Sequence, residues 1–206
     1  MTNTMTDASS PSAYGPSETA LLLLDWYTLF VEKVAGPGAD SALKVAIDLR
    51  KWAKTQNITV VHCLIDANAT PFPTCKGVER FQGLLQLMKN EVQPEPAEIR
   101  ADDKEELTFH RVPGRISAFT SPGLLEYLKE KGIKSLVLTG LSTSGCLLRT
   151  AVTATDAEFV TTVISDACAD MDEDLHQVIL NKIIPSRGHV KSSAEFRKEF
   201  EESQKA

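Results

Sequence analysis

One cysteine, Cys146, follows a turn of small residues that separates an apolar run from a helical pattern. The turn extends from Gly140 to Gly145, so the thiol lies close to a predicted helix N-terminus. Free N–H groups and a partial positive charge at such a terminus favour a thiolate, which is the nucleophilic form of cysteine. The same N–H groups could stabilise an oxyanion during acyl transfer. Cys146 is therefore a candidate nucleophile; the alternative is a buried side chain that only fills space.

Charged residues at the ends of predicted strands could assist this thiol. Asp25 directly follows the apolar run 20–24, and burying a carboxylate there is costly unless it is paired or used. It could take the thiol proton and return it to a leaving group. Arg111 ends another predicted strand, and either it or the nearby Arg115 could orient Asp25 or lower the pKa of the thiol. The alternatives are a purely structural ion pair and ordinary surface arginines.

The sequence gives little support for a metal or a cofactor. His62 and Asp66 could share one face of a strand because their separation is even, whereas His110, His176 and His189 show no ligand spacing. The chain has no GxGxxG after a strand, no P-loop and no GxSxG elbow. We therefore predict a site without metal or cofactor.

The elements that must position these residues alternate along the chain. Apolar runs predict strands at residues 19–24, 58–65, 106–112, 135–139 and 159–165, and helical spacing covers residues 78–88, 122–131, 146–156, 172–184 and the segments that begin at 40 and 193. This order predicts an α/β fold, a doubly wound three-layer α/β/α sandwich with a mainly parallel sheet. Ligands in such folds bind beyond the carboxyl ends of the strands, where Asp25, Arg111 and the turn before Cys146 all fall.

Composition limits the domain organisation and the partners. We expect a flexible tail over residues 1–18, which contain no Lys or Arg, and one domain over residues 19–206. The net charge of −6 and the lack of a basic cluster argue against nucleic acid or a membrane as partner. Neither a signal peptide nor a membrane span is recognisable, so we expect a cytoplasmic protein with four free thiols that acts on a small molecule.

Three segments carry a resemblance to a known family. They are Leu21–Asp25 with Phe30, then Ser117-Ala118-Phe119 with Leu124 and Leu125, and Leu136–Cys146 followed by Thr150, Ala151 and Asp156-Ala157. Over about residues 20–190 the chain resembles the isochorismatase-like hydrolase superfamily, most of all uncharacterised fungal-type members. The family triad is Asp, Lys and Cys. Asp25 and Cys146 match its first and third members, while Arg111 stands where the family has lysine.

The resemblance implies further features of the site. A cis peptide bond would fall at Leu141–Ser142 and would aim backbone N–H groups at the oxyanion. For the mechanism that we expect, Trp26, Phe30 and Phe72 could form the walls of the substrate pocket, the alternative being that each belongs to the core, and Leu141, Ser142 and Arg115 could also bind substrate. Family members commonly form dimers or tetramers, so we expect a homo-oligomer.

The resemblance also bears on the reaction. Isochorismatases proper typically lack a cysteine six residues after the turn glycine, whereas this chain has Gly140 and Cys146 at that spacing. This favours hydrolysis of an amide or ureido C–N bond through a thioester. Asp66-Ala67-Asn68 lacks the histidine of the nicotinamidase metal motif. Two alternatives remain open: hydrolysis of the vinyl ether of isochorismate, and a non-catalytic member that binds a small molecule or a protein.

Overall fold

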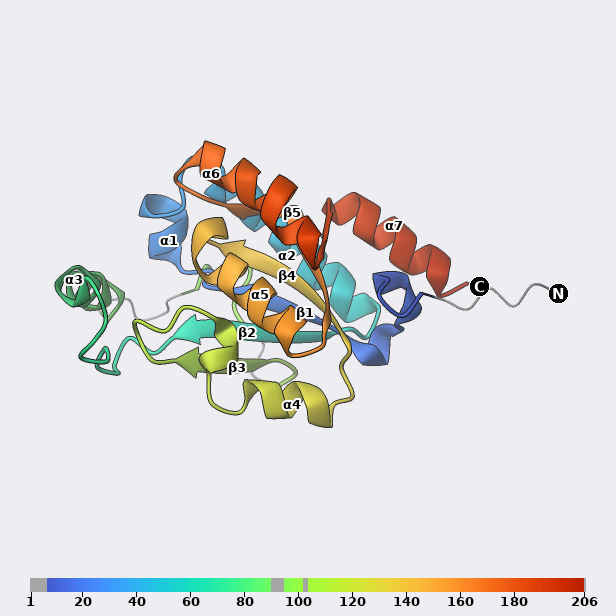
Figure 1. Ribbon diagram of the computed structural model, residues 1–206, viewed down its shortest axis with the longest axis horizontal. Coiled ribbons are helices and arrows are strands. Elements are labelled where there is room, and N and C mark those ends of the chain that lie inside the picture. Colours follow the sequence, from blue (N-terminus) through green and yellow to red (C-terminus); the bar gives the residue numbers. More distant parts are fainter. Residues whose placement is uncertain (1–6, 90–94, 102–103, 206) are drawn as a thin grey trace.

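The computed structural model describes residues 7–89, 95–101 and 104–205, and a parallel sheet of six strands forms its centre (Figure 1). The order across the sheet is β3-β2-β1-β4-β5-β6, and every neighbouring pair is parallel. The strands are β1 (Thr19–Leu24), β2 (Thr59–Ile65), β3 (Leu107–Arg111), β4 (Ser135–Leu141), β5 (Val160–Ala169) and β6 (His189–Lys191). The predicted doubly wound fold is confirmed.

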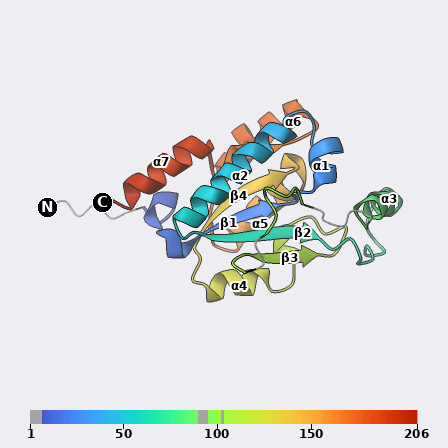
Figure 2. The ribbon, with the colours of Figure 1, turned by 180° about the vertical axis from the view of Figure 1, so that it is seen from behind.

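Helices cover both faces of this sheet (Figures 1 and 2). The α-helices are α1 (Thr28–Lys33), α2 (Ala39–Thr55), α3 (Val78–Lys89), α4 (Leu124–Glu130), α5 (Leu148–Asp156), α6 (Glu173–Val178) and α7 (Ser193–Ser203). Side chains of α2 and α7 share one apolar core with Leu21 and Leu23 of β1, whereas α4 and α5 share the other with Leu22 and Leu24. This alternation follows from the two-residue period of a strand, which sends successive side chains to opposite faces. No helix among the described residues is long and apolar enough to cross a membrane.

The structure differs from the sequence prediction mainly at element ends. β5 continues to Ala169 because its pairing with β4 resumes after a register shift, with Gly140 opposite Cys168. The short helix α1 and the three-residue strand β6 were not predicted. The predicted helix over residues 172–184 is divided into α6, a π-type turn (Ile179–Ile183) and a 3-10 turn that extends to Ser186.

Part of the segment that we expected to be a flexible tail is ordered. Residues 1–6 lie outside the described residues, but two 3-10 turns follow, at Pro11–Ala13 and Pro16–Glu18. A proline near the start of each turn fixes the backbone, and the Ser10 side chain caps the first. Pro11 is buried and lies against Phe196 and Phe200 of α7. The packing of this proline explains why the described part of the segment is not a free tail.

A glycine and an aspartate with left-handed backbone conformation shape the edge where the site lies. Gly140 in β4 has φ +146°, and a Cβ there would lie 2.2 Å from the carbonyl oxygen of Leu24. Only glycine fits this close approach of β4 to β1. Asp25, which directly follows β1, has φ +54°, a conformation that aspartate tolerates better than most residues. The two residues together determine how the chain leaves β1.

Candidate active site

Asp25 and Arg111 form a buried ion pair across the carboxyl edge of the sheet. Asp25 follows β1 and Arg111 ends β3, two strands away, and each is 2% exposed. Arg111 donates from Nη1 to Asp25 Oδ1 at 2.9 Å and from Nη2 to Oδ2 at 2.5 Å. A bidentate pair of this kind fixes both side chains in one orientation. Burial lowers the pKa of Arg111, but the neighbouring Asp25 and Cys146 together outweigh it, so the pKa is raised.

Arg111 and Arg115, the two arginines that the sequence suggested as possible partners of Asp25, lie in different environments. The Arg111 guanidinium reaches Asp25, and its Nε donates to the carbonyl oxygen of Arg115 at 3.0 Å. The side chain of Arg115 is exposed, so Arg115 supports the ion pair through its backbone. The structure therefore brings Asp25 together with Arg111 and not with the Arg115 guanidinium.

Cys146 lies beside this ion pair, in a π-type turn (Thr143–Leu147) that connects β4 to α5. The Cys146 residue is only 3% exposed, and its thiol lies close enough to the Asp25 carboxylate for that charge to act on the pKa of the thiol. Burial and, to a smaller extent, the Asp25 charge raise the pKa of Cys146 to about 12, although Arg111 lowers it. The helix-terminus argument predicted a favoured thiolate, and this was wrong because desolvation dominates. At neutral pH the Cys146 side chain is therefore a thiol that keeps its proton.

The turn before Cys146 is held by residues that sequence reasoning missed. Ser144 N–H donates to Asp170 Oδ2 at 2.7 Å, and Thr143 Oγ1 lies 2.8 Å from His176 Nδ1. Asp170 directly follows β5, a position that would have attracted attention had the strand been predicted to end at Ala169. These contacts fix the turn from a neighbouring strand and from α6.

The peptide bond between Leu141 and Ser142 is cis, as the resemblance implied. Ser142 then begins the turn, and its carbonyl oxygen accepts from Gly145 N–H at 3.0 Å. Since the Ser144 amide donates to Asp170, two amides of the turn already have partners within the protein.

The aromatic residues expected to wall the pocket lie mostly elsewhere. Trp26 and Phe30 pack in the core on the α2 side, together with Leu141, whereas Cys146 packs on the α5 side. Trp26 Nε1 donates to Thr139 Oγ1 at 3.3 Å, which satisfies its polar group inside that core. Phe72 is half-buried, and it lies beside Gly114, which belongs to the loop that follows Arg111. A role of these residues in substrate binding stays a prediction.

A cavity lies beyond the carboxyl ends of β1, β2 and β3. Its volume is about 210 Å³, and Tyr27, Ile65, Asp66 and His110 are among the residues that line it. Tyr27 is two residues from Asp25, and its hydroxyl donates to the Ile65 carbonyl oxygen at 2.9 Å. This is the edge at which doubly wound folds bind their ligands.

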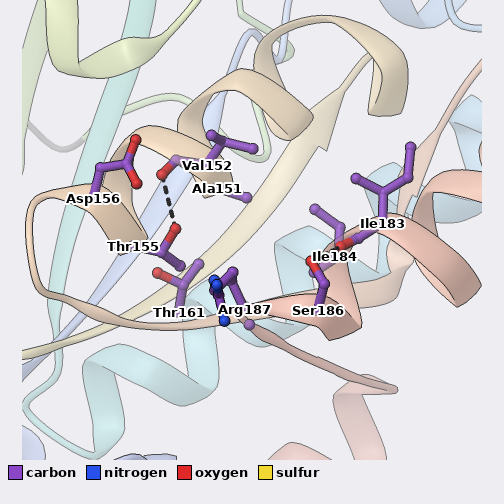
Figure 3. A pocket seen from close by; sticks show the side chains of 10 residues that line it. Ala151, Val152, Thr155, Asp156, Thr161, Ile183, Ile184, Ser186 and Arg187 are labelled. Carbon is purple, nitrogen blue, oxygen red and sulfur yellow. Dashed lines mark hydrogen bonds between the residues drawn. The ribbon is translucent and has the colours of Figure 1, made fainter.

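A second cavity, of about 200 Å³, lies between α5 and residues 183–188 (Figure 3). Thr161, near the amino end of β5, and Asp156, at the end of α5, are among its lining residues. It therefore opens at the edge of the sheet opposite to Asp25, and we assign it no part in the chemistry.

The histidine considered as a metal ligand has other partners. His62 is buried, with Nδ1 2.7 Å from Glu95 Oε1 and Nε2 3.1 Å from Glu106 Oε2. Burial lowers the pKa of His62, but the two glutamates together outweigh it and raise the value. The Asp66 carboxylate instead accepts from Asn68 N–H at 2.9 Å. Within the described residues, no group of three or more His, Cys, Asp or Glu side chains is arranged to hold a metal ion.

The buried thiols predict that alkaline pH destabilises the fold. All four cysteines are free, and burial raises the pKa of Cys63, Cys146 and Cys168 above the ordinary value of 9.0. Above pH 9 the unfolded chain loses thiol protons that the folded protein keeps, so stability present below pH 9 is lost as the pH rises. Each proton that the unfolded chain loses and the folded protein keeps lowers the free energy of unfolding by about 1.4 kcal/mol per pH unit. We expect the urea midpoint to fall between pH 9 and 11, less steeply in Cys168→Ala; a constant midpoint would contradict this.

Comparison with known proteins finds similar sequences and similar structures. The family model described as the isochorismatase domain matches residues 19–195. The maleamate amidohydrolase of Pseudomonas putida is 30% identical over 178 residues, which cover 83% of this chain and 81% of the relative. A nicotinamidase of Acinetobacter baylyi is 41% identical over 70 residues, 31% of this chain and 33% of the relative. A cysteine hydrolase from Pseudomonas syringae pv. phaseolicola has the same fold, with a TM-score of 0.75 and 18% identity over 92% of this chain and 95% of the other.

Proposed function

Because the chain belongs to the isochorismatase family, we propose that this hydrolase cleaves a C–N bond of a small amide or ureido substrate through a thioester on Cys146. The observation that carries the proposal is a buried thiol within electrostatic reach of a carboxylate that Arg111 holds in place. The similarity to a maleamate amidohydrolase and a nicotinamidase supports an amide over other substrate classes.

The first step transfers the thiol proton as the sulfur attacks. Asp25 accepts the proton from Cys146, and the Sγ electron pair forms a bond to the substrate carbonyl carbon. Arg111 occupies one lone pair on each Asp25 oxygen, and the remaining lone pairs can accept the proton. The arginine charge also compensates the negative charge that would otherwise be buried with the carboxylate.

Backbone amides would stabilise the oxyanion that this attack creates. The amides of Ser144 and Gly145 already donate within the protein. We therefore assign the oxyanion to the amides of Ser142 and Cys146, at the two sides of the turn. Donors fixed in advance and shielded from water are the most effective kind of oxyanion site.

The second half of the reaction returns the protein to its starting state. Collapse of the tetrahedral intermediate breaks the C–N bond, and the leaving nitrogen takes the proton from Asp25. Asp25 then accepts a proton from water as the water oxygen attacks the thioester carbonyl. The Sγ–C bond breaks, the thiol regains its proton, and a carboxylic acid (or a carbamate, from a ureido substrate) leaves.

The experiment that tests the proposal is a panel of substrates assayed with the purified protein. The panel contains maleamate, nicotinamide, an N-carbamoyl amino acid and isochorismate, with ammonia release and mass spectrometry of the intact protein as readouts. We expect ammonia from at least one C–N substrate and a mass adduct on Cys146 in rapidly quenched samples. Turnover of isochorismate alone would establish the vinyl ether alternative, and binding without turnover would establish the non-catalytic one.

We also propose that the chain forms a homo-oligomer, a dimer or a tetramer. The described surface includes exposed apolar side chains along one segment, at Met171, Leu175, Val178 and Ile183. Apolar side chains that gather on a surface are typical of protein interfaces. Sedimentation equilibrium at micromolar concentration tests this proposal, and a mass equal to the monomer would overturn it.

A further inference from the structure

We infer that Thr150 is a further catalytic residue of this site, because its hydroxyl contacts the reacting sulfur and donates a hydrogen bond to the Cys146 thiolate. Thr150 Oγ1 lies 3.6 Å from Cys146 Sγ, and both side chains are buried. The two residues are four apart, and the π-type turn with Cys146 runs directly into α5 with Thr150, so their side chains lie on the same side, one above the other. The inference rests on the proposed function and adds a residue to its machinery.

A backbone amide fixes the direction in which the Thr150 hydroxyl donates. Ala118 N–H donates to Thr150 Oγ1 at 2.9 Å. Ala118 begins a 3-10 turn (Ala118–Thr120) that packs against α5, and Ser117 caps it. A hydroxyl has one proton and two lone pairs. With one lone pair taken by this amide, the hydroxyl proton is directed to another acceptor, and the Cys146 sulfur lies within reach.

Thr153, a second threonine of α5, shows the usual hydrogen bond of a threonine hydroxyl in a helix that has no amide partner from outside the helix. Thr153 Oγ1 donates to the Arg149 carbonyl oxygen, four residues back, at 2.8 Å. This is the usual bond of a threonine inside a helix. Thr150 instead bonds an amide from outside the helix and the thiol sulfur.

The contact with Thr150 favours the thiolate over the thiol. While Cys146 keeps its proton, either group can be the donor. Once Asp25 has taken the proton, the sulfur has none to donate and only Thr150 can do so. Hydrogen bonds to an ionised group are about twice as strong as neutral ones. Thr150 therefore stabilises the charged form and opposes the burial that raises the pKa of Cys146.

The test compares three variants by a readout that needs no substrate. Thr150→Val removes the hydroxyl at nearly constant volume, Thr150→Ser keeps it, and Thr153→Val is the matched control on the same helix. The rate of Cys146 alkylation by iodoacetamide is followed from pH 7 to 11 by peptide mass spectrometry. We expect Thr150→Val to slow alkylation about 10- to 100-fold at each pH below the thiol pKa, which then rises by about one to two units. Thr150→Ser and Thr153→Val should remain near the wild-type rate.

Several outcomes would overturn the inference. The first is an unchanged pH profile of Cys146 alkylation in folded Thr150→Val. The second is an equal loss of alkylation rate in Thr150→Ser, because a variant that keeps the hydroxyl would then behave like one that lacks it, as a purely structural defect would. Circular dichroism checks folding, and Thr150→Ala provides the same comparison if valine is not accommodated. If the wild type hydrolyses no C–N substrate but Thr150→Val still shifts the alkylation profile, the proposed function fails and the Thr150 contact stands. If the wild type hydrolyses a C–N substrate but Thr150→Val leaves the alkylation profile unchanged, the proposed function stands and the inference about Thr150 fails.

Discussion

Replacing Cys146 with alanine is expected to lower kcat/KM for the amide substrate by at least about a thousandfold while the protein stays folded. The substitution removes the only protein atom that the proposed mechanism bonds to the substrate carbonyl. It leaves the Asp25–Arg111 ion pair in place, because that pair is held by the bidentate contact and by the Arg115 carbonyl. Ammonia release measures the loss, and urea unfolding shows that the fold persists.

A second buried cysteine provides the matched control. Cys168 in β5 is also buried, and its thiol donates to the Ile164 carbonyl oxygen at 3.0 Å. Cys168→Ala removes the same atoms from the same core and should retain activity within a few-fold of wild type. If Cys146→Ala hydrolysed the substrate at the wild-type rate, Cys146 would not be the nucleophile.

Replacing Arg111 with methionine is expected to destabilise the fold by about 3–5 kcal/mol. Methionine fills much of the same space but leaves the Asp25 carboxylate buried without a counter-charge, and the cost of that desolvation is then uncompensated. Urea denaturation at pH 7 measures the loss as a lower midpoint. Activity should be lost as well, because no guanidinium then holds the Asp25 carboxylate in position to accept the thiol proton.

Two further variants separate the charge from the geometry. Arg111→Lys keeps the charge but offers one ammonium group where the guanidinium offers two parallel donors, so the stability loss should be smaller than with methionine. The double variant Asp25→Asn with Arg111→Met removes both charges and should be more stable than Arg111→Met alone. If Arg111→Met unfolded at the wild-type midpoint, the ion pair would have no structural role.

Two members of the site could be predicted from local sequence signals. Asp25 ends an apolar run, and Cys146 follows a turn of small residues; both features lie within a few residues of the chain. The partner of Asp25 was harder to predict because β1 and β3 are separated by β2 in the sheet. The sequence placed Arg111 and Arg115 at the correct edge, but only the packed structure shows which guanidinium reaches the carboxylate.

The missed features depend on contacts between distant segments. Asp170 holds the turn through Ser144, but the sequence pattern ended the strand at residue 165 because no local signal marks a register shift. The burial of Cys146 reversed the expected direction of its pKa, since a sequence shows the helix terminus and not the depth of the residue. The packing of Trp26 and Phe30 in the core on the α2 side likewise could not be read from the sequence, and their role in substrate binding stays a prediction.

The near-complete burial of Cys146 has a consequence for the timing of the reaction. In the proposed mechanism a substrate carbonyl must reach a sulfur that solvent barely contacts, so we expect the surrounding protein to open before each attack. Openings of this kind take microseconds to milliseconds and limit turnover in many enzymes. Added viscosity would then slow turnover even though no bond of the substrate is affected. Between turnovers, the same enclosure shields the thiol from oxidants, which attack exposed thiolates most readily.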